Sequence, residues 1–91
     1  MLKDFSKIET FFAVVKEKSF SKAAQVLGIS QPAVTQQIKN IEAHLGAPIV
    51  ERKKNGTKLT KEGKELYRIA KRLEKHIQKA EKSLADALEK P

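Results

Sequence analysis

Residues 19–46 read SFSKAAQVLGISQPAVTQQIKNIEAHLG, and this stretch contains the clearest structural signals in the chain. Ser21 is expected to cap a short helix whose small apolar face ends before Gly28. Gly28 begins a turn, Ser30 caps a second helix with a proline in its first turn, and a second glycine ends that helix. Two capped helices joined by a glycine-containing turn are typical of a helix-turn-helix.

The two predicted helices have different faces. Ala23 and Ala24 are small enough to let the helices cross closely. The outer face of the second helix is polar, and such a face is usually only solvated. A helix-turn-helix in a basic chain instead favours DNA recognition by these side chains. The polar face consists of Gln31, Thr35, Gln36 and Lys39.

Length and composition limit the classes of function. With 91 residues, the chain forms one domain with a modest core and no catalytic cleft of usual size. Its net charge of +8, of which +5 lies in residues 1–60 and +3 in residues 61–91, favours a polyanionic partner. The chain has no cysteine, no long apolar run and no secretory signal pattern, so we expect a cytoplasmic protein.

An aromatic stripe precedes the helix-turn-helix. Apolar residues at three- and four-residue spacing predict a helix from about Asp4 to Lys18. Such a stripe is more often core than a platform for stacking bases, so we expect it to cover the back of the helix-turn-helix together with Phe20. The stripe consists of Phe5, Ile8, Phe11, Phe12 and Val15.

The residues after the second helix predict a basic hairpin. Residues 49–52 (IVER) and 57–60 (TKLT) are expected to form strands, joined by a turn that contains the Asn55-Gly56 signal. A hairpin directly after a recognition helix is a wing. The lysines near its tip, Lys53, Lys54 and Lys58, are suited to neutralising phosphates or entering a minor groove, although a basic turn alone is weak evidence.

A long helix is predicted to follow. Thr60 caps it and Gly63 is its weak point. About thirty residues of helix span roughly 45 Å, which is too long for this domain to bury. Its apolar residues follow a heptad pattern that favours a partner helix and a homodimer; the alternative is a lone helix supported by local ion pairs. The predicted seam consists of Leu66, Ala70, Leu73, Ile77, Ala80, Leu84 and Ala87, widened by Ile69 and Leu88.

No pattern points to catalysis. His44 and His76 are far apart in sequence and lack an acid-rich neighbourhood, so neither is expected to bind a metal or act as a general base. The chain also lacks a glycine-rich phosphate loop, paired catalytic carboxylates and a nucleophile elbow. We therefore expect no enzyme activity, no cofactor and no metal.

The segment from Phe11 to Leu66 resembles the N-terminal DNA-binding domain of LysR-type transcriptional regulators. In order, it matches the family patterns S-F-x-x-A-A, S-Q-P-A-V-(S/T)-x-Q-I, L-G-x-x-(I/L)-(V/F)-E-R and L-T-x-x-G. The resemblance implies a mainly α winged helix-turn-helix over residues 1–60, with three helices and a two-stranded wing, and a linker and dimerisation helix over residues 61–91. It also implies antiparallel pairing of that helix with its twin, which places two recognition helices in successive major grooves of an interrupted palindrome.

The resemblance assigns roles to single residues. Those expected to face the bases are Gln31, Pro32, Thr35 and Gln36. An amide such as that of Gln36 pairs with adenine, and Thr35 or Pro32 can contact a thymine methyl group. Those expected to contact the DNA backbone, directly or from the wing, are Ser21, Lys22, Gln37, Lys39, Arg52, Lys53 and Lys54.

The chain departs from the family pattern in three places. Many members have arginine where Gln36 stands, and many have an arginine at the wing tip where this chain has Lys53, Lys54 and Asn55. Members also continue into a domain that senses a small molecule, whereas this sequence stops at Pro91. We therefore expect a shortened piece or a short natural variant, and no effector follows from these residues.

Two other functions fit parts of the sequence. The basic long helix resembles one that lies on an anionic membrane, but its cations are interleaved with acids and its apolar stripe is narrow. A non-specific architectural DNA-binding protein would use charge alone and remains the alternative.

Overall fold

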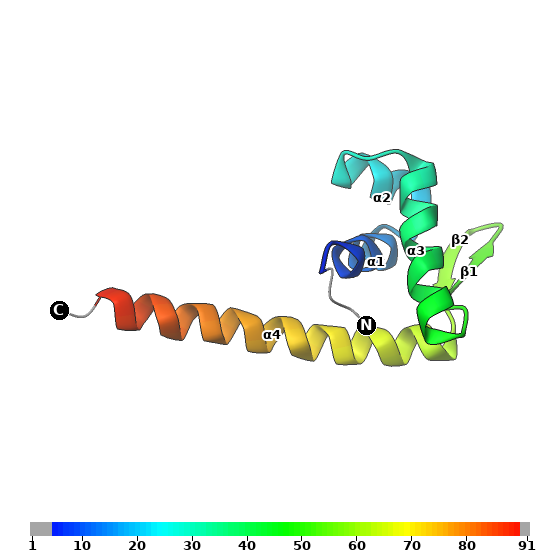
Figure 1. Ribbon diagram of the computed structural model, residues 1–91. Coiled ribbons are helices and arrows are strands. Elements are labelled where there is room, and N and C mark those ends of the chain that lie inside the picture. Colours follow the sequence, from blue (N-terminus) through cyan, green and yellow to red (C-terminus); the bar gives the residue numbers. More distant parts are fainter. Residues whose placement is uncertain (1–4, 90–91) are drawn as a thin grey trace.

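The computed structural model describes residues 5–89, which fold as four helices and one hairpin (Figure 1). The predicted mainly α fold, with three helices, a two-stranded wing and a long final helix, is confirmed. Asp4, with which the first helix was predicted to begin, lies outside the described residues. The elements are α1 (Phe5–Glu17), α2 (Phe20–Leu27), α3 (Gln31–Leu45), β1 (Val50–Lys53), β2 (Gly56–Leu59) and α4 (Lys61–Glu89).

The predicted turn between α2 and α3 is confirmed. Gly28 ends α2 with a φ of 70°, a left-handed conformation that costs glycine little. The Ser30 side chain then accepts a hydrogen bond from the Ala33 amide at 3.2 Å. Gly46 ends α3 in the same left-handed region, with a φ of 76°. The two glycines and Ser30 therefore set the length of α3 and its angle to α2.

The predicted cap of α2 is wrong by two residues. Ser19, rather than Ser21, has the extended backbone of an N-cap, and its side chain accepts a hydrogen bond from the Lys22 amide at 3.1 Å. Ser21 lies exposed within the first turn of the helix. The earlier start places Phe20 at the first helical position, where its ring is 7% exposed and packs into the core.

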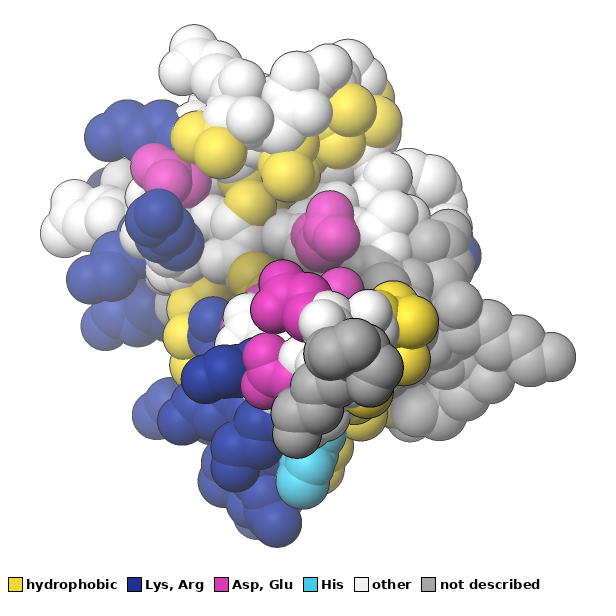
Figure 2. Space-filling model, turned by 90° about the vertical axis from the view of Figure 1, so that its left-hand side faces the viewer, with side chains coloured by type: hydrophobic (Ala, Val, Ile, Leu, Met, Phe, Trp, Pro, Cys, Tyr) yellow, Lys and Arg dark blue, Asp and Glu magenta, His cyan; other side chains and the backbone are white. Residues whose placement is uncertain are grey.

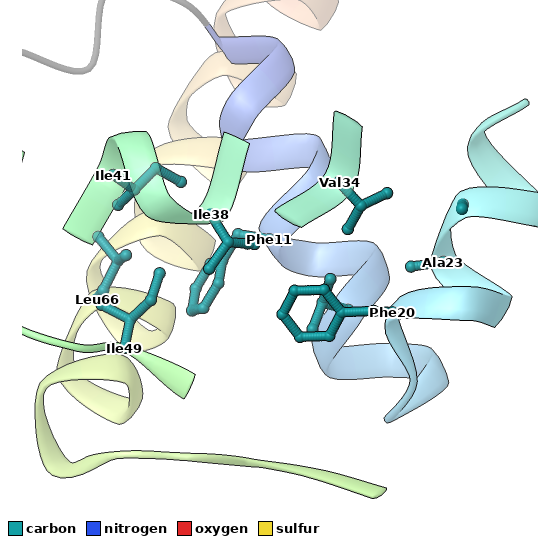
Figure 3. Packing of buried hydrophobic residues seen from close by; sticks show 10 residues of the cluster. Phe11, Phe20, Ala23, Val34, Ile38, Ile41, Ile49 and Leu66 are labelled. Atoms are coloured by element: carbon teal, nitrogen blue, oxygen red, sulfur yellow. The ribbon is translucent and has the colours of Figure 1, made fainter. Parts of the chain in front are cut away.

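The core lies where α1 crosses behind α2 and α3 (Figure 3). Phe11 is fully buried, as the aromatic stripe predicted, whereas Val14 takes the deepest place on the next turn and the predicted Val15 is half-buried. Ala23 and Ala24 are buried against this core, as the close crossing requires. The core continues under the wing and α4 through Ile41, Ile49 and Leu66, which Figure 3 shows close together.

The predicted wing is an antiparallel hairpin, with its turn at the predicted residues 53–56. Val50 pairs with Leu59 and Lys53 pairs with Gly56, so Lys54 and Asn55 connect the strands, and each strand is shifted by one residue from the predicted 49–52 and 57–60. Gly56 belongs to β2 and has a φ of 119°. A Cβ atom at this glycine would lie 2.9 Å from the Lys18 carbonyl oxygen, which also accepts a hydrogen bond from the Thr57 amide at 3.1 Å. The wing is therefore anchored to the end of α1.

The wing and α4 meet in a closely packed junction around Thr60 and Gly63. Thr60 caps α4 as predicted: its hydroxyl accepts from the Gly63 amide at 2.9 Å and donates to the Pro48 carbonyl at 2.7 Å. A Cβ atom on Gly63 would lie only 1.9 Å from the Ile49 carbonyl oxygen. Gly63, predicted as the weak point of the helix, is also the residue that lets α4 approach the backbone at Ile49.

Beyond the junction, α4 leaves the body of the domain and extends as a single helix (Figure 1). Its first turns pack on α1, where the Tyr67 ring meets the Phe12 ring edge-on at a centroid distance of 5.7 Å. The molecule is consequently elongated, with principal extents of 56 × 27 × 21 Å. Over residues 5–89, no helix has the length and apolar content needed to cross a membrane.

Gly63→Ala is expected to destabilise the fold. Helix propensity alone favours alanine by about 1 kcal/mol. Because the new Cβ meets backbone rather than a movable side chain, we expect a net loss of about 2 kcal/mol or more in the free energy of unfolding, measured by urea titration followed by circular dichroism. The matched control is Glu62→Ala at an exposed neighbouring position, with a change within about 0.5 kcal/mol. A Gly63→Ala protein as stable as the wild type would contradict the close approach.

Candidate nucleic-acid interface

The first two turns of α3 bring together the four residues that were predicted to face bases. Gln31, Pro32 and Gln36 are exposed, and Thr35 is half-buried. All four line one shallow, open depression, which we call the reading surface. The helix-turn-helix crossing buries the other side of α3 through Val34, so this polar side must face outward.

Asn40 extends the reading surface by one turn, and it was not among the predicted residues. The Gln36 amide nitrogen donates to the Asn40 side-chain oxygen at 2.8 Å, and both residues are exposed. Residues four apart on a helix are neighbours, and this spacing is the signal that identifies Asn40 in the sequence. The side-chain amides of Gln36 and Asn40 are therefore adjacent on the exposed side of α3.

Arg52 connects the wing to the reading surface. Its guanidinium donates to the Thr35 hydroxyl at 3.1 Å and lies 4.0 Å above the centroid of the Phe20 ring. One side chain of β1 thus contacts both helices of the helix-turn-helix. Arg52 was predicted to contact the DNA backbone; in the structure its guanidinium sets the position of the wing relative to Thr35.

Glu42, near the C-terminal end of α3, also holds the wing in place relative to α3. One of its carboxylate oxygens accepts a hydrogen bond from the Ile49 amide at 2.7 Å and lies 3.5 Å from the Val50 amide. The charged acceptor strengthens these contacts at the start of β1. Sequence reasoning missed this role because Ile49 lies seven residues further along, past the end of the helix, where helical spacing gives no signal.

Gln37 lies at the junction of α3 with α1. The hydroxyl of Thr10, which is 2% exposed, donates to the Gln37 side-chain oxygen and lies 3.1 Å from the Ser6 carbonyl oxygen. Gln37 is half-buried there. The Gln37 side-chain oxygen therefore takes part in the packing of α3 against α1. Contact of Gln37 with a DNA backbone stays a prediction and would be made by its side-chain amide nitrogen.

Cations flank the reading surface. Among the predicted backbone contacts, the exposed side chains are those of Ser21, Lys22, Lys39, Arg52, Lys53 and Lys54. Lys39 and Arg52 line a hollow between α3 and the wing. On the other side of the wing, a groove between α1, β2 and α4 is lined by Lys18, Lys53, Lys58 and Lys64. The one ion pair among the described wing residues joins Lys53 to Glu51 at 3.3 Å, with both side chains 53% exposed.

The predicted dimer seam divides into a buried part and a free part. Leu66 and Ala70 are only 8% and 7% exposed, yet they line the same groove as the more exposed seam residues, so their contact with a partner helix stays a prediction. Leu73 and Ile77 remain 44% and 38% exposed. They line an apolar groove with Ile8 and Phe12 of α1. The remaining seam residues, Ala80, Leu84 and Ala87, are exposed.

The described residues contain no metal-binding arrangement. Within residues 5–89, no group of three or more histidine, cysteine, aspartate or glutamate side chains lies close enough to hold an ion. His44 and His76 are both exposed, on α3 and α4 respectively.

The part of the chain that carries the reading surface and the wing matches a known protein family. The family model for the bacterial regulatory helix-turn-helix proteins of the lysR family matches residues 5–64, which include the reading surface and the wing. The chain belongs to the LysR family. Its LysR-family relatives include the regulator AbaB of Streptomyces antibioticus, 42% identical over 84 residues, which are 91% of this chain and 28% of AbaB.

A second relative is similar to this chain in both sequence and structure. The regulator BenM of Acinetobacter baylyi is 46% identical over 63 residues, which are 69% of this chain and 21% of BenM. The crystal structure of the BenM DNA-binding domain with catB site 1 DNA matches with a TM-score of 0.88 at 33% identity, covering 97% of this chain and 99% of that chain. The chain thus spans less than a third of the length of these two LysR-family regulators.

Arg52→Lys tests the contact between wing and helices. Lysine keeps the charge but lacks the planar fork that stacks on Phe20 while it donates to Thr35. We expect the free energy of unfolding to fall by about 0.5–1 kcal/mol, measured by urea titration. Lys53→Arg is the control, with no measurable change, because Lys53 has only an exposed ion pair. Equal effects of the two substitutions would contradict the positioning role of Arg52.

Proposed function

We propose that this chain is the sequence-specific DNA-binding module of a LysR-type transcriptional regulator and that it binds double-stranded DNA as a dimer. The observation that carries the proposal is the reading surface itself: four residues of a capped α3 stand together, and Thr35 also lines an adjoining hollow with the cations Lys39 and Arg52. The proposed activity is binding alone, without catalysis, and its setting is the cytoplasm of a bacterium.

The geometry supports insertion of α3 into a major groove. The N-terminal turns of a recognition helix contact base edges, and these turns of α3 carry Gln31, Pro32, Thr35 and Gln36. Amides can bond adenine in a bidentate manner, and Pro32 offers an apolar contact to a thymine methyl group. The absence of arginine among these four residues favours A·T-containing sites over contacts to guanine.

The wing and α2 supply contacts to DNA phosphates, which do not depend on the base sequence of the DNA. Lys53 and Lys54 stand at or beside the tip of the hairpin, and Lys22 lies in the first turn of α2. Cations at these positions neutralise phosphates and so fix the register of α3 on the duplex. The similarity to the DNA-bound BenM domain over nearly the whole chain supports the same docking.

Dimerisation is proposed through the free part of the α4 seam. Leu73, Ile77 and Leu84 leave a row of large apolar side chains exposed along a helix that the domain does not cover. Exposed apolar rows of this length are typical of interaction surfaces. A twin α4 would cover this row and bring a second reading surface onto the same duplex, as an interrupted palindrome requires.

Gln36→Ala separates specific recognition from binding by charge. We expect the affinity for a duplex carrying the preferred site to fall by about 1–3 kcal/mol, with nearly unchanged affinity for random DNA, measured by fluorescence anisotropy. Lys54→Ala is the matched comparison: it should weaken binding to both duplexes and reduce the slope of log affinity against log salt by about 1. Equal losses on both duplexes for Gln36→Ala would favour the architectural alternative.

Leu73→Glu tests the seam. A carboxylate in the centre of the exposed apolar row should prevent pairing of two α4 helices, so the protein should sediment as a monomer in analytical ultracentrifugation and bind a full site at least tenfold more weakly. Lys75→Glu, which is exposed and lies about 200° around the helix from both Leu73 and Ile77, should leave the sedimentation coefficient unchanged. A dimer that persists in Leu73→Glu would contradict the seam.

A further inference from the structure

A second basic surface lies on α4, away from the wing. Four cations follow one another at spacings of three, four and three residues, which places them on one side of the helix. All are exposed. We call them the α4 row: Arg72, Lys75, Lys79 and Lys82. Figure 2, which looks along α4 from its far end, shows dark-blue side chains gathered on the lower left of this helix and yellow ones on its opposite side.

The α4 row has no acidic partner within the described part of the chain. The ion pairs of α4 are Arg68 with Glu65 and Lys71 with Glu74. The hydrogen bond between Arg68 and Glu65 lowers the pKa of Glu65 and raises the pKa of Arg68. Three members of the α4 row, together with His76, instead line a surface hollow that no carboxylate enters. Like charges three and four residues apart destabilise a helix, so this arrangement costs stability.

The α4 row stays accessible when the seam is covered. Lys75 lies two residues from both Leu73 and Ile77, about 200° around the helix from each. A twin helix on the apolar seam therefore leaves the cations on the outside of the dimer. Leu73, Ile77 and Leu84 lie on the other side of α4, and Ile69, three residues before Arg72, is the exposed large apolar side chain of residues 61–89 that neighbours the row.

The α4 row also lies away from the DNA that α3 reads. Figure 1 shows the later turns of α4 extending away from α3 and the wing. Arg72 stands eleven residues into the helix, about 16 Å along its axis from Lys61, and the row continues for about 15 Å more. Its cations consequently cannot bond the phosphates next to the base pairs at the reading surface.

We propose that the α4 row binds the phosphate backbone of a second DNA segment, outside the site read by α3. The inference rests on the proposed function, because the first segment is the one that α3 holds. About 15 Å of helix carries four cations, and one DNA strand carries about four phosphates over the same length of its axis. The match in spacing favours a linear polyanion. An anionic membrane or an acidic protein would find a single large apolar side chain, Ile69, at one end of the row, which is less than membrane insertion or an interface anchor requires.

The test is capture of a second duplex. A 20-base-pair duplex with the preferred site is immobilised and saturated with protein, and a labelled 20-base-pair duplex of unrelated sequence is then added. Wild-type protein should retain the labelled duplex. The fourfold variant Arg72→Gln, Lys75→Gln, Lys79→Gln and Lys82→Gln should lower its apparent affinity by at least tenfold, while occupancy of the first duplex changes less than twofold. Helix content by circular dichroism verifies that the variant is folded.

The control variant removes four cations elsewhere: Lys3→Gln, Lys7→Gln, Lys16→Gln and Lys61→Gln. It has the same net charge as the row variant and should retain capture. Capture that survives in the row variant, or falls equally in the control, would overturn the inference. Displacement of the labelled duplex by polyglutamate at equal charge concentration, or by vesicles containing phosphatidylserine, would assign the row to an acidic protein or a membrane instead.

The same variants distinguish this inference from the proposed function. Failure of the wild-type protein to bind the first duplex would contradict the proposed function alone. The unrelated duplex is then titrated directly, and the α4 row is supported if the row variant binds at least tenfold more weakly than the control variant and overturned if the two bind equally.

Discussion

The close approach of α4 to the backbone at Ile49 is the constraint on which the rest of the structure depends. Gly63 allows it, because any side chain there would meet the Ile49 carbonyl, and the Thr60 hydroxyl fills the space between the Pro48 carbonyl and the Gly63 amide. Glu42 holds the same segment from the end of α3. Recognition helix, wing and long helix therefore meet at one point, and a change in the angle of one moves the others.

This junction gives the exposed surfaces a shared geometry. The reading surface lies at the start of α3, the wing stands beside it through Arg52, and the free seam begins on α4 after Ala70. A partner helix on that seam would place the second reading surface at a set distance and angle. The dimer would thus bind best to two half-sites whose spacing matches the distance between its reading surfaces.

The sequence predicts the elements well and their junctions poorly. Capping residues and glycines such as Ser30, Gly28 and Gly46 act within a few residues, so their effect on α2 and α3 is visible in the chain. The function of Gly63 and of Glu42 depends on backbone atoms that only the tertiary fold brings near. For the same reason the heptad pattern shows that Leu66 is apolar but not that the single protomer already covers most of this side chain. The cap at Ser19, two residues before the predicted Ser21, likewise goes with burial of Phe20 at the first helical position, which local capping signals do not show.

The central claim is that two reading surfaces, tied together through α4, recognise DNA at a fixed separation. Selection of bound duplexes from a random library by the 91-residue chain tests it most directly. The account predicts an enriched pair of inverted half-sites at one constant spacing, close to one helical turn of DNA or a multiple of it. Enrichment of no motif, of a single half-site, or of half-sites at variable spacing would contradict it.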